Sequence, residues 1–196
     1  MELPDRLTDR ELRVIVSELL VATADGGDPM LDQAIAEVLA TLRRKLGLDV
    51  VFVSEFIDGR RMFRYVDHSG PETVIRPGQS NPLEESYCQR VVDGRLPELI
   101  RDTAALPPGT DLPRAPVPVG AHLSTPIVLK GGETYGTLCC FSARPRPELR
   151  EADLETLRLC AKLVARKIEI ARREGFVEPP PEWQLEPAQE YRSPIW

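Results

Sequence analysis

The chain has 196 residues, a formal net charge of −6 and no Lys/Arg cluster in its sequence, so we do not expect it to bind nucleic acids or anionic membranes. Apolar residues make up 42% of it, which is enough for one domain with a buried core and extensions. The N-terminus lacks the apolar segment of a signal peptide, and no apolar run approaches the roughly 20 residues that cross a bilayer, so we expect a cytoplasmic protein.

Two helices are predicted in the first 47 residues. The sequence "TDRE" at residues 8–11 is a capping box, and apolar residues at helical spacing follow it until "DGG" at 25–27. Asp28 and Pro29 then suit the start of a second helix, and Gly47 suits its end. The apolar stripe of this second helix comprises Leu31, Ile35, Val38, Leu39, Leu42 and Leu46.

An antiparallel strand pair follows. Asp58-Gly59 lies between two runs rich in β-branched and aromatic residues, which predicts a tight hairpin with strands at about 50–57 and 60–67. The stretch "PLEESYCQRVVDG" predicts a short helix that ends at Gly94, and "PELIRD" predicts a short strand. Residues 103–118 contain five prolines and predict a loop.

The segment "VGAHLSTPIVLKGGETYGTLCCF", residues 119–141, predicts two more strands at about 119–129 and 133–142 around a glycine turn. A long helix is expected from about 149 to 173. One of its apolar stripes comprises Leu154, Leu157, Ala161, Val164, Ile168 and Ala171, and a second, nearly opposite, comprises Leu159, Leu163 and Ile170.

A helix with two apolar faces needs two partners, and the sheet can cover only one of them. We expect a second subunit to cover the other, which predicts a homodimer formed through the first and last helices. The alternative is a helix enclosed within one domain, with the first helix as its second partner. Residues 174–196 carry five prolines, two tryptophans and a tyrosine, and we expect this tail to offer a site for a protein partner.

This element order predicts an α+β fold. Long helices at both ends can cover one face of an antiparallel sheet, which leaves the short helix and the proline-rich loop for the other face. The domain organisation expected is an N-terminal helix at 1–27, a domain at 28–173 and a tail at 174–196. Irregular connections over a sheet are where small-molecule pockets form.

Three segments resemble the GAF domain family. "GAHLSTPIVLKGGETYGTLCCFS" looks like the closing hairpin of these domains, "LGLDVVFVSEFIDG" like their first strand, and "ESYCQRVVDGRLPELIRD" like their pocket helix and the strand after it. The resemblance covers about residues 28–173. It implies a sensory or regulatory module of GAF/PAS-like architecture that binds cyclic nucleotides, haem, bilins or small metabolites, or that binds nothing and dimerises.

The cofactor motifs of the family do not fit well. Bilin-binding members attach their chromophore through a pocket Cys commonly followed by His, whereas Gln89 follows Cys88 here and Cys140 follows Cys139. The cyclic-nucleotide pattern cannot be placed on this chain. Haem would require an axial histidine, and His122 is the better placed of the two histidines, although a lone strand histidine is more often structural. The cofactor therefore stays unknown, and the cysteine spacing predicts no metal site.

Cys88 is the cysteine of most interest, because it lies in the segment that resembles the pocket helix. Glu84 and Glu85 precede it, and nearby carboxylates would raise the pKa of its thiol. Arg90 or His122 could reverse that effect if either lay close in space. We therefore expect a chain that is not an enzyme. The alternative is a thiol-based redox enzyme or sensor that uses Cys88, similar to free methionine sulfoxide reductases.

Phe63 and Tyr65 are two residues apart on one strand and should share a face, as should His122 and Ser124 on another. Aromatic residues here are explained equally well as core. Asp102 could touch a ligand, but a turn cap is expected. The expected ligand-binding residues are Phe63, Tyr65, Tyr87, Cys88, Asp102, His122 and Ser124.

These observations predict a non-catalytic sensory module. We expect a small molecule to bind between the sheet and residues 82–118, and the signal to pass through a helical homodimer interface. The remaining alternative is a protein-interaction module without a ligand.

Overall fold

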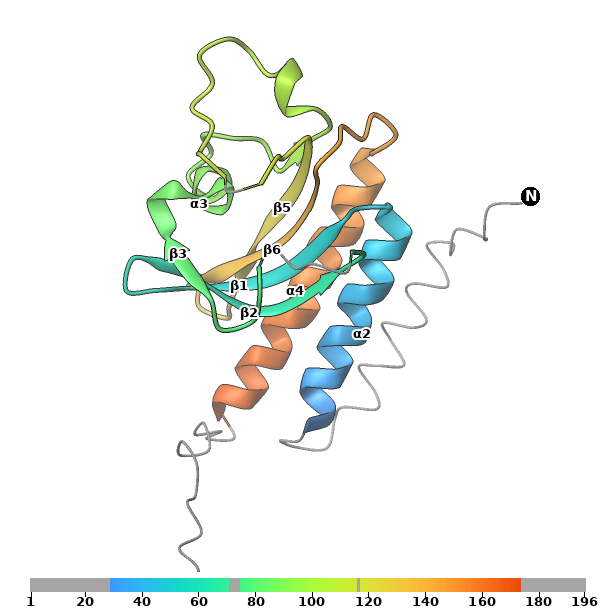
Figure 1. Ribbon diagram of the computed structural model, residues 1–196. Coiled ribbons are helices and arrows are strands. Elements are labelled where there is room, and N and C mark those ends of the chain that lie inside the picture. Colours follow the sequence, from blue (N-terminus) through green and yellow to red (C-terminus); the bar gives the residue numbers. More distant parts are fainter. Residues whose placement is uncertain (1–28, 71–74, 116, 174–196) are drawn as a thin grey trace, which may run out of the picture.

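The sheet has six antiparallel strands in the order β3-β2-β1-β6-β5-β4 (Figure 1) within the residues that this computed structural model describes, which are 29–70, 75–115 and 117–173. The predicted first helix at 1–27 and the tail at 174–196 lie outside them. The strands are β1 (Val50–Ile57), β2 (Arg60–His68), β3 (Ser80–Pro82), β4 (Leu99–Ile100), β5 (Ala121–Val128) and β6 (Thr134–Ser142). The helices are α2 (Pro29–Leu46), η1 (Leu83–Glu85), α3 (Tyr87–Val92), η2 (Thr103–Ala105) and α4 (Glu151–Arg173).

The two long helices cover one face of the sheet, and the short helices and loops cover the other. Figure 1 shows α2 and α4 side by side beneath the strands, with α3 and the long loop on the opposite side. This arrangement confirms the predicted α+β architecture. The outer limits of the predicted domain, residues 28 and 173, stay predictions.

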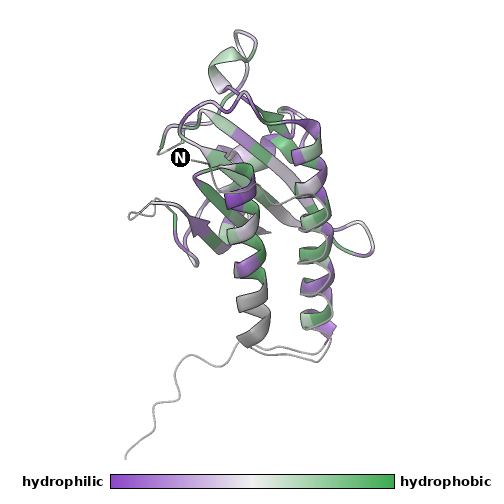
Figure 2. Ribbon diagram, turned by 90° about the vertical axis from the view of Figure 1, so that its right-hand side faces the viewer, coloured by the Kyte–Doolittle hydropathy of each residue, from purple (hydrophilic) through white to green (hydrophobic). Residues whose placement is uncertain are grey.

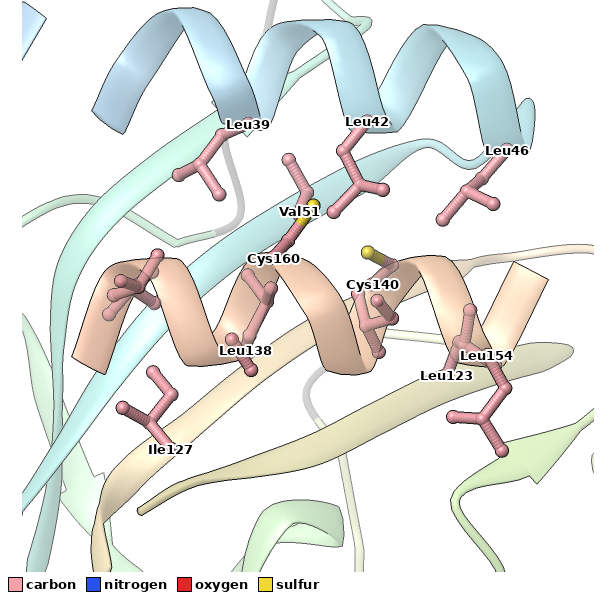
Figure 3. Packing of buried hydrophobic residues seen from close by; sticks show 14 of the residues in the cluster. Leu39, Leu42, Leu46, Val51, Leu123, Ile127, Leu138, Cys140, Leu154 and Cys160 are labelled. Atoms are coloured by element: carbon pink, nitrogen blue, oxygen red, sulfur yellow. The ribbon is translucent and has the colours of Figure 1, made fainter. Parts of the chain in front are cut away.

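The helix-side core is the apolar layer between α2, α4 and the sheet. It forms because apolar residues of α2 between Ile35 and Leu46 and apolar residues of α4 between Leu154 and Ile168 meet the strand residues that point toward them (Figure 3). Fully burying one leucine contributes about 1.5–3 kcal/mol, so this layer is a main source of stability. Figure 3 labels Leu39, Leu42, Leu46, Val51, Leu123, Ile127, Leu138, Cys140, Leu154 and Cys160 in it.

The hydropathy colours alternate along both long helices, as expected for amphipathic helices that bury one side (Figure 2). The second apolar stripe of α4 lies outside the helix-side core. Leu159 is 37% exposed, and Leu163 and Ile170 are partly buried. One of the two predicted faces of this helix is thus packed on the sheet within the described chain.

The β1–β2 hairpin follows the sequence prediction closely. Asp58 has φ 49° and Gly59 has φ 69°, the two positive values that a tight two-residue hairpin turn requires. The predicted bounds of β1 and β2 agree with the structure to within one residue. Strand β3 was not predicted, because three residues carry no readable alternation.

Candidate functional site

The candidate site lies on the loop-side face, which is the face of the sheet that α3 and the loops cover. Strands β5 and β6 build its floor, with Ser124 opposite Cys139 and His122 opposite Phe141. Cys139 packs on this face with Phe52, Phe63, Cys88 and Phe141. The adjacent Cys140 lies in the helix-side core, as alternation along a strand requires. The structure therefore assigns His122, Ser124 and Cys139 to the side on which a pocket was expected.

Phe63 and Tyr65 do not share a face, so this prediction was wrong. The register of β2 shifts between the pairs Val53–Tyr65 and Ser54–Phe63, which leaves Arg64 as the extra residue of a β-bulge. The bulge turns Phe63 onto the loop-side face and Tyr65 toward the helix-side core. Only Phe63 of this pair belongs to the site.

Helix α3 brings two candidate residues over the floor. The Ser86 hydroxyl accepts a hydrogen bond from the Gln89 N–H at 3.1 Å and caps the helix, which places Tyr87 and Cys88 in the buried first turn. The Tyr87 ring lies over the His122 imidazole with a centroid distance of 4.9 Å. Five of the predicted residues, Phe63, Tyr87, Cys88, His122 and Ser124, thus lie on one face.

The environment of Cys88 differs from the one that its sequence neighbours suggested. Glu84 and Glu85 are exposed, and the Arg90 guanidinium binds Asp111 and backbone carbonyls instead. The cation beside Cys88 is Arg61, whose Nη1 lies 3.1 Å from the Cys88 Sγ. The expectation that local carboxylates control this thiol was wrong, because those side chains point into solvent.

The thiol cluster consists of Arg61, Cys88, His122 and Cys139. The Cys139 Sγ lies 3.2 Å from His122 Nε2. Burial raises the pKa of Cys88, but the Cys139 thiol as a hydrogen-bond donor, the charge of Arg61 and the His122 ring together hold that pKa well below its ordinary value. Burial and the neighbouring Cys88 raise the pKa of Cys139, so Cys88 is the more acidic of the two thiols.

The tautomer of His122 decides which group donates in its 3.2 Å contact with the Cys139 Sγ. With the ring hydrogen on Nε2, Nδ1 of the neutral imidazole is an acceptor. His122 Nδ1 and Ser124 Oγ are both buried without a hydrogen-bond partner among the described residues.

Asp102 lies apart from this arrangement. Its Oδ1 accepts a hydrogen bond from the Ala104 N–H at 2.9 Å and caps η2, which is the capping role expected from the sequence.

A hollow of about 710 Å³ lies on the other side of the sheet edge, between α4 and β5, and does not include the thiol cluster. Its lining includes Glu98, Pro126, Val128, Arg158, Leu159 and Lys162.

Sequence reasoning missed two members of the cluster as site residues. Arg61 sits two positions before Phe63, and alternation from Phe63 would have placed it on the same face. Cys139 could be assigned only a face relative to Cys140.

Among the described residues, no set of three or more His, Cys, Asp or Glu side chains is arranged to hold a metal ion. No helix in these parts of the chain has the length and apolar character needed to span a membrane.

Comparisons with known proteins agree with this fold. The similar solved structures include the GAF domain of an Acinetobacter phosphoenolpyruvate-protein phosphotransferase, with a TM-score of 0.65, 16% identity, and coverage of 87% of this chain and 99% of the other. They also include free methionine-R-sulfoxide reductase from Neisseria meningitidis in complex with its substrate, with a TM-score of 0.63, 17% identity, and coverage of 89% and 96%.

A third similar structure is the phycoerythrobilin-bound GAF domain of a cyanobacterial phytochrome, with a TM-score of 0.64, 17% identity, and coverage of 86% of this chain and 100% of the other. At these identities the likeness concerns the fold. No protein of curated function matches the sequence. A family model described as the GAF domain matches residues 30–169, which is well over half of the chain and confirms the resemblance predicted from the three segments. The chain belongs to the GAF domain family.

Proposed function

We propose that this chain is a sensory module that binds a small molecule on the loop-side face, in contact with Tyr87, His122 and Ser124. The observation that carries the proposal is the pair of buried, unpartnered polar atoms, His122 Nδ1 and Ser124 Oγ. An unsatisfied buried polar group costs about 1–3 kcal/mol, so native proteins rarely keep two of them together on one face. A ligand that bonds both atoms removes this cost.

The two atoms specify part of the ligand's chemistry. With the ring hydrogen of His122 on Nε2, Nδ1 is an acceptor, to which the ligand presents an N–H or O–H group. The Ser124 hydroxyl can donate or accept, and it lies two residues along the same strand face. The Tyr87 ring and the aromatic floor around Phe52 and Phe63 favour a ligand with a flat apolar part.

Two of the similar structures support small-molecule binding by this architecture, because one holds phycoerythrobilin and the other its substrate. Covalent bilin attachment is not part of the proposal. Cys88 is followed by Gln89 rather than His, and its sulfur is paired with Arg61.

The proposed output is a change in a helical homodimer. Strand β5 carries His122 and Ser124 on the loop-side face, and α4 packs against the same strand from the other face. A ligand that shifts β5 can therefore alter α4, whose second apolar stripe is the proposed dimer contact. The ligand changes the equilibrium only by the difference in its affinity for the two packings.

Native mass spectrometry of the full chain, purified from its own cells, tests the binding proposal. We expect the wild-type protein to carry a small non-protein mass and His122→Phe to lose it. A wild-type sample without such a mass would contradict the proposal.

Stability measurements give a matched check on Ser124. Ser124→Ala removes a hydroxyl without a partner, so the free energy of unfolding of the ligand-free chain should stay constant or rise. Thr137→Val removes a buried hydroxyl that lies 2.9 Å from Ser54 Oγ and should cost about 1–3 kcal/mol. An equal loss in both variants would show that Ser124 has a structural partner such as a buried water, and would count against a ligand role.

A further inference from the structure

Arg61 is a partly buried cation whose partners are unusual. Its Nη1 faces the Cys88 Sγ at 3.1 Å, its Nε donates to Asn81 Oδ1 at 3.0 Å, and its guanidinium lies over the Phe63 ring at 4.8 Å from the centroid. Within the described parts of the chain, no carboxylate forms an ion pair with it. The Cys88 sulfur is therefore the group that can supply the compensating negative charge.

Cys139 approaches the same sulfur from another element. Cys88 lies on α3 and Cys139 on β6, and the two side chains pack in one cluster under that helix. His122 Nε2 lies 3.2 Å from the Cys139 Sγ, so with its hydrogen on Nε2 the ring can stabilise negative charge on that sulfur as well. The sulfur beside Arg61 and a second thiol beside His122 are thus neighbours.

The other two cysteines lack these features. Cys140 and Cys160 lie in the helix-side core among aliphatic side chains. Burial raises the pKa of Cys140 well above its ordinary value and that of Cys160 to about 11. The chain therefore contains internal controls, two cysteines that are equally buried but have raised pKa values.

We propose that Cys88 and Cys139 are a redox-active pair that a hydroperoxide converts into an intramolecular disulfide. In the first step, the Cys88 sulfur attacks the terminal peroxide oxygen. The S–O bond forms as the O–O bond breaks, the peroxide gains the two electrons that sulfur loses, and the departing oxygen takes up a proton to leave as an alcohol or water. Cys88 is then a sulfenic acid.

In the second step, the Cys139 sulfur attacks the Cys88 sulfur. The S–S bond forms, the S–O bond breaks, and the leaving hydroxide takes the Cys139 proton to depart as water. The hydrogen bond from His122 stabilises the charge that develops on Cys139 during this attack. The charge of Arg61 stabilises the thiolate form of Cys88, which makes the attack in the first step.

Access to the pair passes through α3. Cys88 is fully buried, so the oxidant reaches it when this six-residue helix moves, and a hydroperoxide as small as hydrogen peroxide needs the least opening. The disulfide would tie α3 to β6 beside Tyr87 and His122. Its formation does not depend on the ligand, whereas its effect on ligand binding rests on the proposed function.

Peptide mapping tests the disulfide directly. The full chain is treated with hydrogen peroxide at pH 7, free thiols are blocked with N-ethylmaleimide, and the protein is digested with trypsin without reduction. Cys88 falls in peptide 65–90, Cys139 and Cys140 in 131–150, and Cys160 in 159–162. We expect 65–90 and 131–150 to be joined, with the loss of two hydrogens. Unreacted thiols, a link to 159–162, or Cys88 oxidised to sulfinic acid without a link would overturn the proposal.

Two neighbouring variants locate the second sulfur. Cys139→Ser should abolish the link and Cys140→Ser should keep it, although the two residues are adjacent in the chain. The reverse pattern would overturn the assignment. Arg61→Leu should slow loss of the Cys88 thiol about tenfold at pH 7, and Arg61→Lys should restore most of the rate, because both effects act through the thiolate fraction. Equal rates in all three proteins would remove Arg61 from the chemistry.

Discussion

Glu84 and Glu85 precede Cys88 in the chain, yet both are exposed, and the groups that face its sulfur are Arg61, His122 and Cys139. Arg61 arrives from a hairpin 27 residues earlier, and His122 and Cys139 arrive from strands at the far end of the domain. The charge state of a buried thiol depends on such spatial neighbours because electrostatic interactions are strong where water is excluded.

The lowered pKa of Cys88 makes stability depend on pH. Between the folded pKa and the ordinary value of 9.0, the unfolded state binds more protons than the folded state, so this contribution rises with pH. It is complete above the unfolded pKa and is lost as pH falls through the folded pKa. We therefore expect the difference in unfolding free energy between wild type and Cys88→Ala to grow from pH 6 to pH 8 in urea titrations under reducing conditions.

Cys160→Ala is the matched control for this experiment. Burial raises the Cys160 pKa to about 11, so this thiol stays protonated in both states below pH 8 and its difference from wild type should be flat. A flat difference for Cys88 as well would show that its sulfur is a neutral thiol in the folded chain.

Strands β1, β2 and β6 show how single residues decide the geometry of an element. The bulge at Arg64 reverses the alternation of β2 and separates Phe63 from Tyr65. Position 136 shows a different effect of one residue, because it accepts only glycine, which has no side chain. A Cβ atom there would lie 1.9 Å from the Ser54 carbonyl oxygen, because β6 and β1 approach closely at this pair.

Gly136→Ala should therefore destabilise the chain strongly. The added Cβ atom would clash with backbone atoms of β1, and neither side can avoid the clash by rotating a side chain. The two central strands must therefore separate, at a cost of at least about 3 kcal/mol. Gly59→Ala is the comparison, because that site has φ +69° and open space around it and should cost about 1–2 kcal/mol. Thermal unfolding of both variants shows which substitution causes the larger loss of stability. An equal or smaller loss for Gly136→Ala would show that β1 and β6 can relax apart.

At the scale of the whole molecule, the sheet separates two environments. The helix-side core supplies most of the apolar burial, while the loop-side face holds Cys88 and Cys139 beside Arg61 and His122. In the proposed function, helix α4 links ligand binding to dimerisation. It packs on β5 with one apolar stripe and leaves Leu159 of the other stripe exposed.

The proposed homodimer predicts a specific response to mutation. Leu159→Glu places a charge in the second stripe of α4 and should weaken self-association of the full chain at least about tenfold. Leu112→Glu is the control, because Leu112 is similarly exposed, at 36%, but lies in the loop on the other side of the sheet. Light scattering after size-exclusion chromatography measures both. A monomeric wild-type chain at high concentration would contradict the dimer.

Much of the fold could be predicted from the sequence because the relevant signals are local. Periods of 3.6 and 2 mark helices and strands, and Asp58-Gly59 specifies its hairpin turn through backbone sterics alone. Five site residues, Phe63, Tyr87, Cys88, His122 and Ser124, were predicted and do lie on one face. Their role in binding a ligand stays a prediction.

The rest depended on packing between distant segments. Alternation determined that Cys139 and Cys140 face opposite ways, but only the positions of α2 and α4 decided which of them meets Cys88. The same packing placed Arg61 on the Cys88 sulfur and turned Glu84 and Glu85 into solvent. The sequence by itself determined the long helices and strands of the described chain, because their signals repeat along it. Only the tertiary structure decided which side chains share a buried space, and for a thiol that space decides its chemistry.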